Sequence, residues 1–202
     1  MSLSDPLMLE LLPMPLRWLT PAQDWQMGER SLELSAGPAT DLFSDPARAE
    51  PLVNAPALVG AAQGDFLLSA LVQVEFASTF DAGVLLLRRD ERNWAKLCFE
   101  LSPQSEPTVV SVVTRGVSDD CNSFTVEGAE VWLRIARLGD CFAFHASTGD
   151  GFWRLVRYFT LEGDGEVSIG FLAQSPTGKG CRARFDEIFF DERRLGDLRS
   201  GE

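Results

Sequence analysis

Apolar and polar residues alternate along the chain in short segments, most regularly between residues 109 and 172. A period of two is typical of a β-strand that buries one face and turns the other to polar surroundings. The segments that show it are Phe66–Phe76, Val84–Arg88, Trp94–Leu101, Val109–Arg115, Val131–Leu138, Cys141–Ser147, Phe152–Phe159, Val167–Leu172 and Cys181–Phe190. Helix signals are nearly absent, so the pattern predicts a chain built from about a dozen strands.

The connections between these segments are short and rich in glycine. They contain Gly139-Asp140, Gly149-Asp150-Gly151, Gly163-Asp164-Gly165 and Pro176-Thr177-Gly178. Such steps between alternating segments are strong hairpin signals. Hairpins without intervening helices predict antiparallel strands. The expected fold class is therefore all-β, an antiparallel two-sheet β-sandwich or jelly roll.

The first third of the chain and its C-terminal end are less regular. Leu16–Leu19 and Trp25–Leu34 are expected to be strands, whereas Asp45–Gly60 is rich in proline and alanine and is expected to be a loop. The simplest organisation of 202 residues is one domain over residues 1–202, with its core at about 16–190. The charged tail 191–202 has little apolar content and is expected to fray or to form a short helix.

The polar side of the central segments gathers cations and indole rings. If Leu97, Phe99, Val110, Val112 and the residues in phase with them point into the core, alternation places a second set on the opposite face. That set is Trp94, Lys96, Glu100, Ser111, Arg115, Trp132, Arg134, His145 and Arg157. All of them except Ser111 are candidate ligand-binding residues. Arg115 and Arg134 are expected to converge around Glu100, the only carboxylate of the set.

This combination of side chains predicts a groove for a carbohydrate or a small anionic ligand. Aromatic rings stack on the C–H faces of sugars, and the guanidinium fork binds carboxylate or phosphate through paired hydrogen bonds. The alternative is a solvated sheet surface with internal salt bridges, which contribute little to stability. The sequence leaves both interpretations open.

Glycoside hydrolysis requires two carboxylates on either side of the scissile bond. Glu162–Glu166 has alternating acids, but its two glycines favour a hairpin turn over a strand. Glu100 is better placed but has no second carboxylate on its strand face, since Asp119 and Asp120 are expected in a loop. His145 is the only histidine, and no G-x-S-x-G motif accompanies it. We therefore expect no catalytic residues, although a glycan-active hydrolase stays open as an alternative.

The chain is acidic, with a formal net charge of −12 and a pI near 4.5. Phosphates of nucleic acid and anionic membrane surfaces would be repelled, so neither is an expected partner. The apolar run Leu7–Met14 follows no basic region and precedes no small-residue cleavage site, and no stretch reaches the length of a membrane-spanning helix. We therefore expect a cytoplasmic protein.

No motif for a cofactor or a metal is present. Phosphate-binding loops, dinucleotide glycine motifs and EF-hand loops are missing from the sequence. The four cysteines, Cys98, Cys121, Cys141 and Cys181, are scattered without a CxxC pair. Buried, reduced thiols are the expected state of all four.

Several segments, taken in order, resemble one protein family. They are Thr40-Asp41-Leu42-Phe43 with Asp45-Pro46, Gly64-Asp65-Phe66, Phe80-Asp81-Ala82-Gly83, Asn93-Trp94-Ala95-Lys96-Leu97 with Glu100, Val112-Val113-Thr114-Arg115-Gly116 with Ser118-Asp119, and Gly170-Phe171-Leu172-Ala173-Gln174-Ser175-Pro176 with Gly178, Gly180 and Phe185. Over residues 16 to 190 the chain is similar to domain of unknown function 1349, also called the regulation-of-enolase-like family. The resemblance implies a concanavalin-A-like lectin/glucanase jelly roll with a groove on its concave sheet. It implies no reaction, cofactor or catalytic residue.

Three functions follow as hypotheses. The first is a non-catalytic binding module whose concave groove holds a carbohydrate or a small anionic ligand. The second is an interaction module that regulates another protein, such as a metabolic enzyme, as the family name implies. The third is the glycan-active hydrolase.

Overall fold

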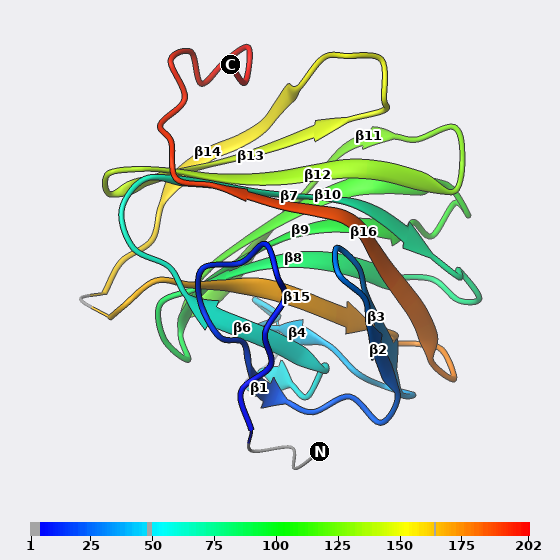
Figure 1. The fold of residues 1–202 in the computed structure, drawn as a ribbon. Helices are drawn as coiled ribbons and strands as arrows, with labels where there is room; N and C mark the ends of the chain where they lie inside the picture. Colours follow the sequence, from blue (N-terminus) through cyan, green and yellow to red (C-terminus); the bar gives the residue numbers. More distant parts are fainter. Residues whose placement is uncertain (1–4, 48–49, 164) are drawn as a thin grey trace.

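The structure, a computed structural model, describes residues 5–47, 50–163 and 165–202. All regular elements in this part of the chain are β-strands, and every pairing between them is antiparallel. Two seven-stranded sheets stack face to face (Figure 1). The predicted fold class, an all-β sandwich of two antiparallel sheets, is confirmed.

The first sheet has the strand order β1 (Arg17–Thr20), β6 (Ala57–Ala61), β15 (Ser168–Gln174), β8 (Ala82–Arg88), β9 (Asn93–Leu101), β10 (Pro107–Arg115), β11 (Val117–Thr125). The second sheet has the order β14 (Arg154–Thr160), β13 (Cys141–Ser147), β12 (Glu130–Leu138), β7 (Phe66–Val74), β16 (Cys181–Asp191), β3 (Leu32–Ala36), β2 (Trp25–Met27). A small ribbon of β4 (Leu42–Phe43) and β5 (Leu52–Val53) lies outside both sheets.

The main hydrophobic core fills the space between the two sheets. Alternation along each strand sends one set of apolar side chains inward, such as Leu97 and Phe99 of β9 and Leu133 of β12, all fully buried. Phe171 of the first sheet meets Phe185 of the second with their ring centroids 5.1 Å apart. Burial of this interior is the main force that holds the sheets together.

The outer face of each sheet is also covered. Residues 37–47 and 50–57, which we call the crossing segment, cover an apolar cluster on the outer face of the first sheet that includes Trp94 and Val112. On the second sheet, Leu195 and Leu198 of the C-terminal chain pack against Leu67, Ala136, Ala143, Leu138 and Leu155. Strands buried on both faces explain why several segments are apolar in both phases.

Three segments differ from the expectation. Asp45–Gly60 contains β5 and most of β6 rather than only a loop. Its alanines and prolines give no clear alternation of apolar and polar residues, so the pattern did not predict these strands. Trp25–Leu34 is two strands joined by a turn, which the hydrogen bond from Gly28 N–H to Ser31 O closes at 2.9 Å. The C-terminal tail neither frays nor forms a helix, since its two leucines dock on the second sheet.

All four cysteine thiols are free. Cys98 and Cys181 are buried as expected, whereas Cys141 is half-buried and Cys121 is exposed. Cys121 lies on β11, an edge strand whose side chains are mostly exposed, so the expected burial was wrong there. In the part of the chain that the structure describes, no helix is long and apolar enough to cross a membrane.

The two sheets approach each other closely at Gly83 of β8. A Cβ atom added to Gly83 would meet Val72 Cγ1 at 2.8 Å and Ala183 Cβ at 3.2 Å, both on the second sheet. Gly37 is the matched control, because an added Cβ there meets nothing within 4 Å. We expect Gly83→Ala to lower the free energy of unfolding by about 1–3 kcal/mol through overpacking. Gly37→Ala should leave it nearly unchanged in urea denaturation, and equal effects of the two variants would contradict this account.

Candidate ligand-binding site

Hydrogen bonds hold the crossing segment on the outer face of the first sheet at two places, Thr40 and Ser44. Thr40 and Ser175 exchange backbone hydrogen bonds of 3.1 and 3.2 Å beside the end of β15. Further along, the Ser44 N–H donates to Ser118 Oγ at 2.9 Å, and Ser44 Oγ donates to Gly116 O at 2.8 Å, in the β10–β11 hairpin. The segment therefore runs obliquely across β8, β9 and β10.

A buried ion pair holds the segment between these two places. Lys96 of β9 is 2% exposed, and its Nζ donates to Asp41 Oδ1 at 3.3 Å and to Gln174 Oε1 at 2.9 Å. The ammonium also lies 5.7 Å from the ring centroid of Phe43 and 5.9 Å from that of Trp94. Burial opposes the charged form, but the acidic neighbours, with Asp41 foremost, outweigh it and raise the pKa of Lys96.

Glu100 shares this face with Lys96. Its half-buried carboxyl lies 3.5 Å from Gln174 Nε2. Burial raises the pKa of Glu100 to about 8, the charge of Lys96 opposes the shift, and the charges of Asp120 and Asp41 add to it. Glu100 is therefore mostly protonated at neutral pH, while Lys96 keeps its charge.

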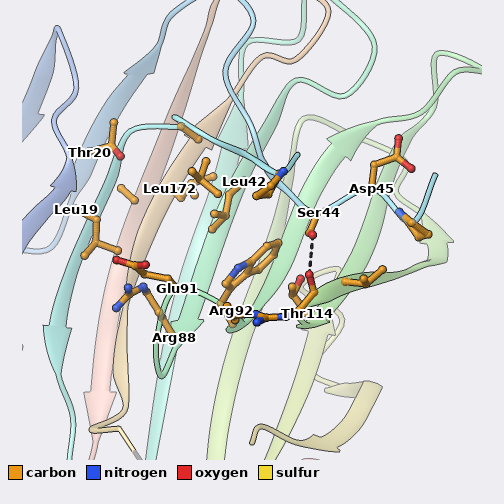
Figure 2. A pocket seen from close by; sticks show the side chains of 18 residues that line it. Leu19, Thr20, Leu42, Ser44, Asp45, Arg88, Glu91, Arg92, Thr114 and Leu172 are labelled. Atoms are coloured by element: carbon orange, nitrogen blue, oxygen red, sulfur yellow. Dashed lines mark hydrogen bonds between the residues drawn. The ribbon is translucent and has the colours of Figure 1, made fainter. Parts of the chain in front are cut away.

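Beside this ion pair, a cavity of about 780 Å³ opens between the sheet and the crossing segment (Figure 2). Its floor includes Trp94, Thr114 and Leu172 of the first sheet. The end of β1, the crossing segment and the β8–β9 turn form its walls through Leu19, Thr20, Leu42, Ser44, Asp45, Arg88, Glu91 and Arg92. The volume lies within the range of small-molecule sites, which are about 300–1,000 Å³.

Three hydrogen-bond donors line this cavity without a partner among the residues that the structure describes. The guanidinium groups of Arg88 and Arg92 form no side-chain hydrogen bond or ion pair there, and the same holds for the Trp94 indole N–H. Arg88 is half-buried and Arg92 is exposed, whereas Trp94 is 2% exposed. The cavity thus combines an indole with two cations that make no ion pair with the described residues, although the pKa of Asp90 is lowered, first by the hydrogen bond from the Arg92 backbone N–H and to a smaller extent by the charge of Arg88. The carboxylates of Asp45 and Glu91 are in the cavity wall.

The eight predicted binding residues do not share one groove. Trp94, Lys96 and Glu100 lie together on the outer face of the first sheet, but only Trp94 lines the cavity. Ser111 points to the interior with Val109 and Val113, and is 1% exposed. The assumed phase of β10 was wrong, because valines occupy both of its faces and alternation cannot distinguish them.

Trp132, Arg134 and His145 lie instead on the outer face of the second sheet, where the C-terminal tail covers Arg134 and His145. Arg134 Nη2 donates to Gly201 O at 2.6 Å, and His145 Nε2 lies 2.7 Å from Leu198 O. Burial lowers the pKa of His145 to about 4, so its ring is neutral at pH 7.

Arg115 and Arg157 lie at a third place, the edge where β14 meets β10 and β11. Arg157 pairs with Asp119 at 2.8 Å, and Arg115 donates to Thr160 O at 2.8 Å. The prediction that Arg115 and Arg134 converge around Glu100 is therefore wrong. Alternation tells which residues of a strand share a face, but not which sheet the strand joins.

Glu100 is not the only carboxylate on its face. Asp119 and Asp120 lie in β11 rather than in a loop, and Asp120 stands in register with Val112 and Lys96. Residues 162–163 and 165–166 connect β14 to β15 outside any strand, as the turn prediction required, and Asp164 lies outside the described residues. Within the described ranges, no group of three or more His, Cys, Asp or Glu side chains is placed to hold a metal ion.

Arg88 and Arg92 were missed by the sequence analysis, although a signal for them exists. They flank the turn between Val84–Arg88 and Trp94–Leu101, and the register pairs Arg88 with Trp94. A tight hairpin at this point predicts that pairing, and hence an arginine beside an indole. Thr20, Ser44 and Asp45 come from segments without such a signal and reach the cavity only through the tertiary fold.

Comparison with known proteins agrees with this architecture. Residues 18–193 match the model of a family described as protein of unknown function (DUF1349). The "Regulation of enolase protein 1" of Saccharomyces cerevisiae is 25% identical over 123 residues, which are 60% of this chain and 62% of the yeast protein. The chain thus spans about three fifths of the length of this curated relative.

Solved structures share the fold. A functionally unknown protein from Saccharomyces cerevisiae is 21% identical with a TM-score of 0.81, over 90% of this chain and 97% of that one. The GH43 BlXynB protein of Bacillus licheniformis has a TM-score of 0.67 and 16% identity, over 88% of this chain but only 37% of the Bacillus chain. The carbohydrate-binding module CBM66 of Bacillus subtilis gives 0.54 at 14% identity, over 86% and 94%. At these identities the likeness is one of fold.

The buried ion pair is open to a direct test with the two lysines of the chain. Lys96→Ala leaves the Asp41 carboxylate without its cation, so we expect a loss of about 3–5 kcal/mol in the free energy of unfolding. Lys179 is exposed in a turn, and Lys179→Ala should leave stability unchanged. Chemical denaturation measures both. A loss below 1 kcal/mol for Lys96→Ala would show that the pair does not hold the crossing segment.

The raised pKa of Glu100 predicts a pH dependence of stability. The native state keeps a proton that the unfolded chain releases above pH 4.5, so stability from this residue falls as the pH rises from 4.5 to about 8. We expect Glu100→Gln to gain stability relative to the parent chain between pH 5 and pH 8. Thermal melts across this range compare the two proteins, and His145 titrates equally in both. A constant difference between them would contradict the raised pKa.

Proposed function

Because the chain belongs to the DUF1349 family of proteins of unknown function, we propose a function from its own site: it is a non-catalytic binding module. Its ligand is a carbohydrate that carries an anionic group, a carboxylate or a phosphate. The ligand occupies the cavity between the crossing segment and the outer face of the first sheet. Arg88 and Arg92 bind the anionic group, and Trp94 binds the sugar.

The observation that carries this proposal is the set of unpaired donors in the cavity. The formal net charge of the chain is −12, yet Arg88 and Arg92 line one cavity without an ion-pair partner in the described residues. A guanidinium group binds carboxylate or phosphate oxygens through two parallel hydrogen bonds. The Trp94 N–H supplies a third donor, so an acceptor-rich ligand matches the cavity.

The acceptors of the cavity favour a sugar over an inorganic anion. Asp45 and Glu91 line the same space, together with the hydroxyls of Thr20, Ser44 and Thr114. Carboxylates accept hydrogen bonds from sugar hydroxyls but repel a bare anion. The fold likeness to the CBM66 carbohydrate-binding module supports the same ligand class.

Hydrolysis is the second candidate function, and one observation favours it. Glu100 holds its proton at neutral pH, as a general acid must, and the charge of Asp120 acts on it. Both acids lie on the outer face of the first sheet but outside the wall of the cavity. A binding module needs neither of them, so Glu100→Gln separates the two functions.

We expect glucuronate and glucose 6-phosphate to bind at least about tenfold more tightly than glucose in isothermal titration, since each adds a charged hydrogen-bonding group. Arg88→Ala and Arg92→Ala should each weaken binding of the anionic sugars by about tenfold and leave glucose unaffected. Arg154→Ala, in an exposed ion pair with Asp150 on the second sheet, is the matched control and should change nothing.

Two results would overturn the proposal. One is equal affinity of the parent chain and both cavity variants for the anionic sugars. The other is hydrolysis: the parent chain releases a sugar product from an oligosaccharide of glucuronate, and Glu100→Gln abolishes this release. That result would identify a hydrolase instead.

A further inference from the structure

The C-terminal segment, residues 192–202, lies on the outer face of the second sheet without joining the sheet. Within the described chain, the backbone hydrogen bonds of this segment are internal, such as Gly201 N–H to Asp197 O at 2.9 Å. Its contacts with the sheet are the hydrogen bonds from Arg134 and His145, the packing of Leu195 and Leu198, and an exposed ion pair of Arg194 with Asp65. The segment is thus held by side-chain contacts and not by a strand ladder, and elements without a ladder open more readily than paired strands.

Arg134 is a buried cation that forms no ion pair with any residue in the described ranges. It is 4% exposed, its Nη2 donates to one neutral carbonyl, and its Nε is buried with no hydrogen-bond partner. Its guanidinium carbon lies 4.0 Å from the ring centroid of Trp153. Burial, with the nearby charge of Arg193, lowers the pKa of Arg134 to about 10, so the group stays charged at pH 7. The C-terminal segment therefore leaves the charge of this guanidinium uncompensated.

The surface around the segment has the composition of a protein interface. Trp132 and Trp153 stand edge to face beside Arg134, and tryptophan and arginine are the residues most enriched at binding hot spots. Phe189 and Tyr158 lie on the same face in register with Arg134 and Ala136, and are 47% and 49% exposed. The apolar surface thus continues beyond the area that the segment covers.

We propose that the outer face of the second sheet is a docking surface for another protein, and that the C-terminal segment occupies it in cis until the partner replaces it. The partner presents a short peptide with a leucine-like side chain and a carboxylate. The leucine takes the place of Leu195, and the carboxylate pairs with Arg134. This surface lies on the opposite side of the sandwich from the cavity of the proposed function and is independent of it.

The position of Gly201 shows where the carboxylate fits. Arg134 Nη2 donates to Gly201 O at 2.6 Å, whereas a Cβ atom added to Gly201 would clash with Arg134 Nη2 and with Trp153 Cβ, so no side chain fits at this position. A peptide copy of the segment that ends at this glycine converts the accepting carbonyl into a terminal carboxylate. Such a peptide therefore presents its carboxylate to the unpaired guanidinium without a side chain in the crowded space.

The test uses two copies of residues 192–201 labelled with fluorescein at the N-terminus, one with a free C-terminal carboxylate and one with a C-terminal amide, titrated into the full chain by fluorescence anisotropy. We expect the acidic peptide, the one with the carboxylate, to bind at least about tenfold more tightly, as one charged hydrogen bond implies. Leu195→Ala in the full chain weakens the cis occupant, so both peptides should bind it more tightly than they bind the parent chain.

Arg134→Gln should abolish the preference for the acidic peptide, and Arg134→Lys, which keeps the charge but loses the fork, should reduce it. Arg154→Ala, on the same sheet but outside the surface, should leave it intact. Absence of peptide binding to the Leu195→Ala chain, or a preference that survives Arg134→Gln, would overturn the proposal. Dimers of the Leu195→Ala chain in light scattering would overturn the choice of partner, because the occupant would then be a second copy.

Discussion

The site on the first sheet depends on one buried ion pair. Lys96 is almost fully buried and pairs its charge with Asp41, which belongs to the crossing segment rather than to the sheet. A buried ammonium is costly without an anion, so the segment stabilises the sheet by supplying Asp41. The pair therefore fixes the wall of the cavity on a strand of the sandwich, although most of that wall is irregular chain.

The Lys96–Asp41 pair lies between two parts of the same face, the neutral acid Glu100 on one side and the cavity on the other. Gln174 joins the ion pair to Glu100, which stays neutral because it is half-buried near two other acids. The cavity lies beside Trp94 and has unpaired cations at its edge. The segments that carried the family resemblance supply this face: Asp41, Phe43, Trp94, Lys96, Ser118 and Gln174 all lie on it or against it. Their convergence is a reason to look here for a function shared by the family.

Much of the fold could be predicted from alternation, but the grouping of polar residues could not. The period of two in Trp94–Leu101 correctly separated Leu97 and Phe99 from Lys96 and Glu100. It failed for β10, where both faces are apolar, and it placed Arg134 and His145 with Lys96 although they lie on the other sheet. Assignment to a sheet depends on long-range pairing, which a local pattern does not contain. The segments with the weakest patterns, the crossing segment and residues 192–202, cover the two outer faces.

The proposed ligand binds in the cavity beside Trp94. The chain has five tryptophans, so its NMR spectrum contains five indole N–H signals, and those of Trp132 and Trp153 report on the opposite face of the sandwich. Titration of the ¹⁵N-labelled chain with glucuronate should shift the Trp94 signal and leave those two unchanged. Shifts at Trp132 and Trp153 with an unmoved Trp94 signal would contradict the account.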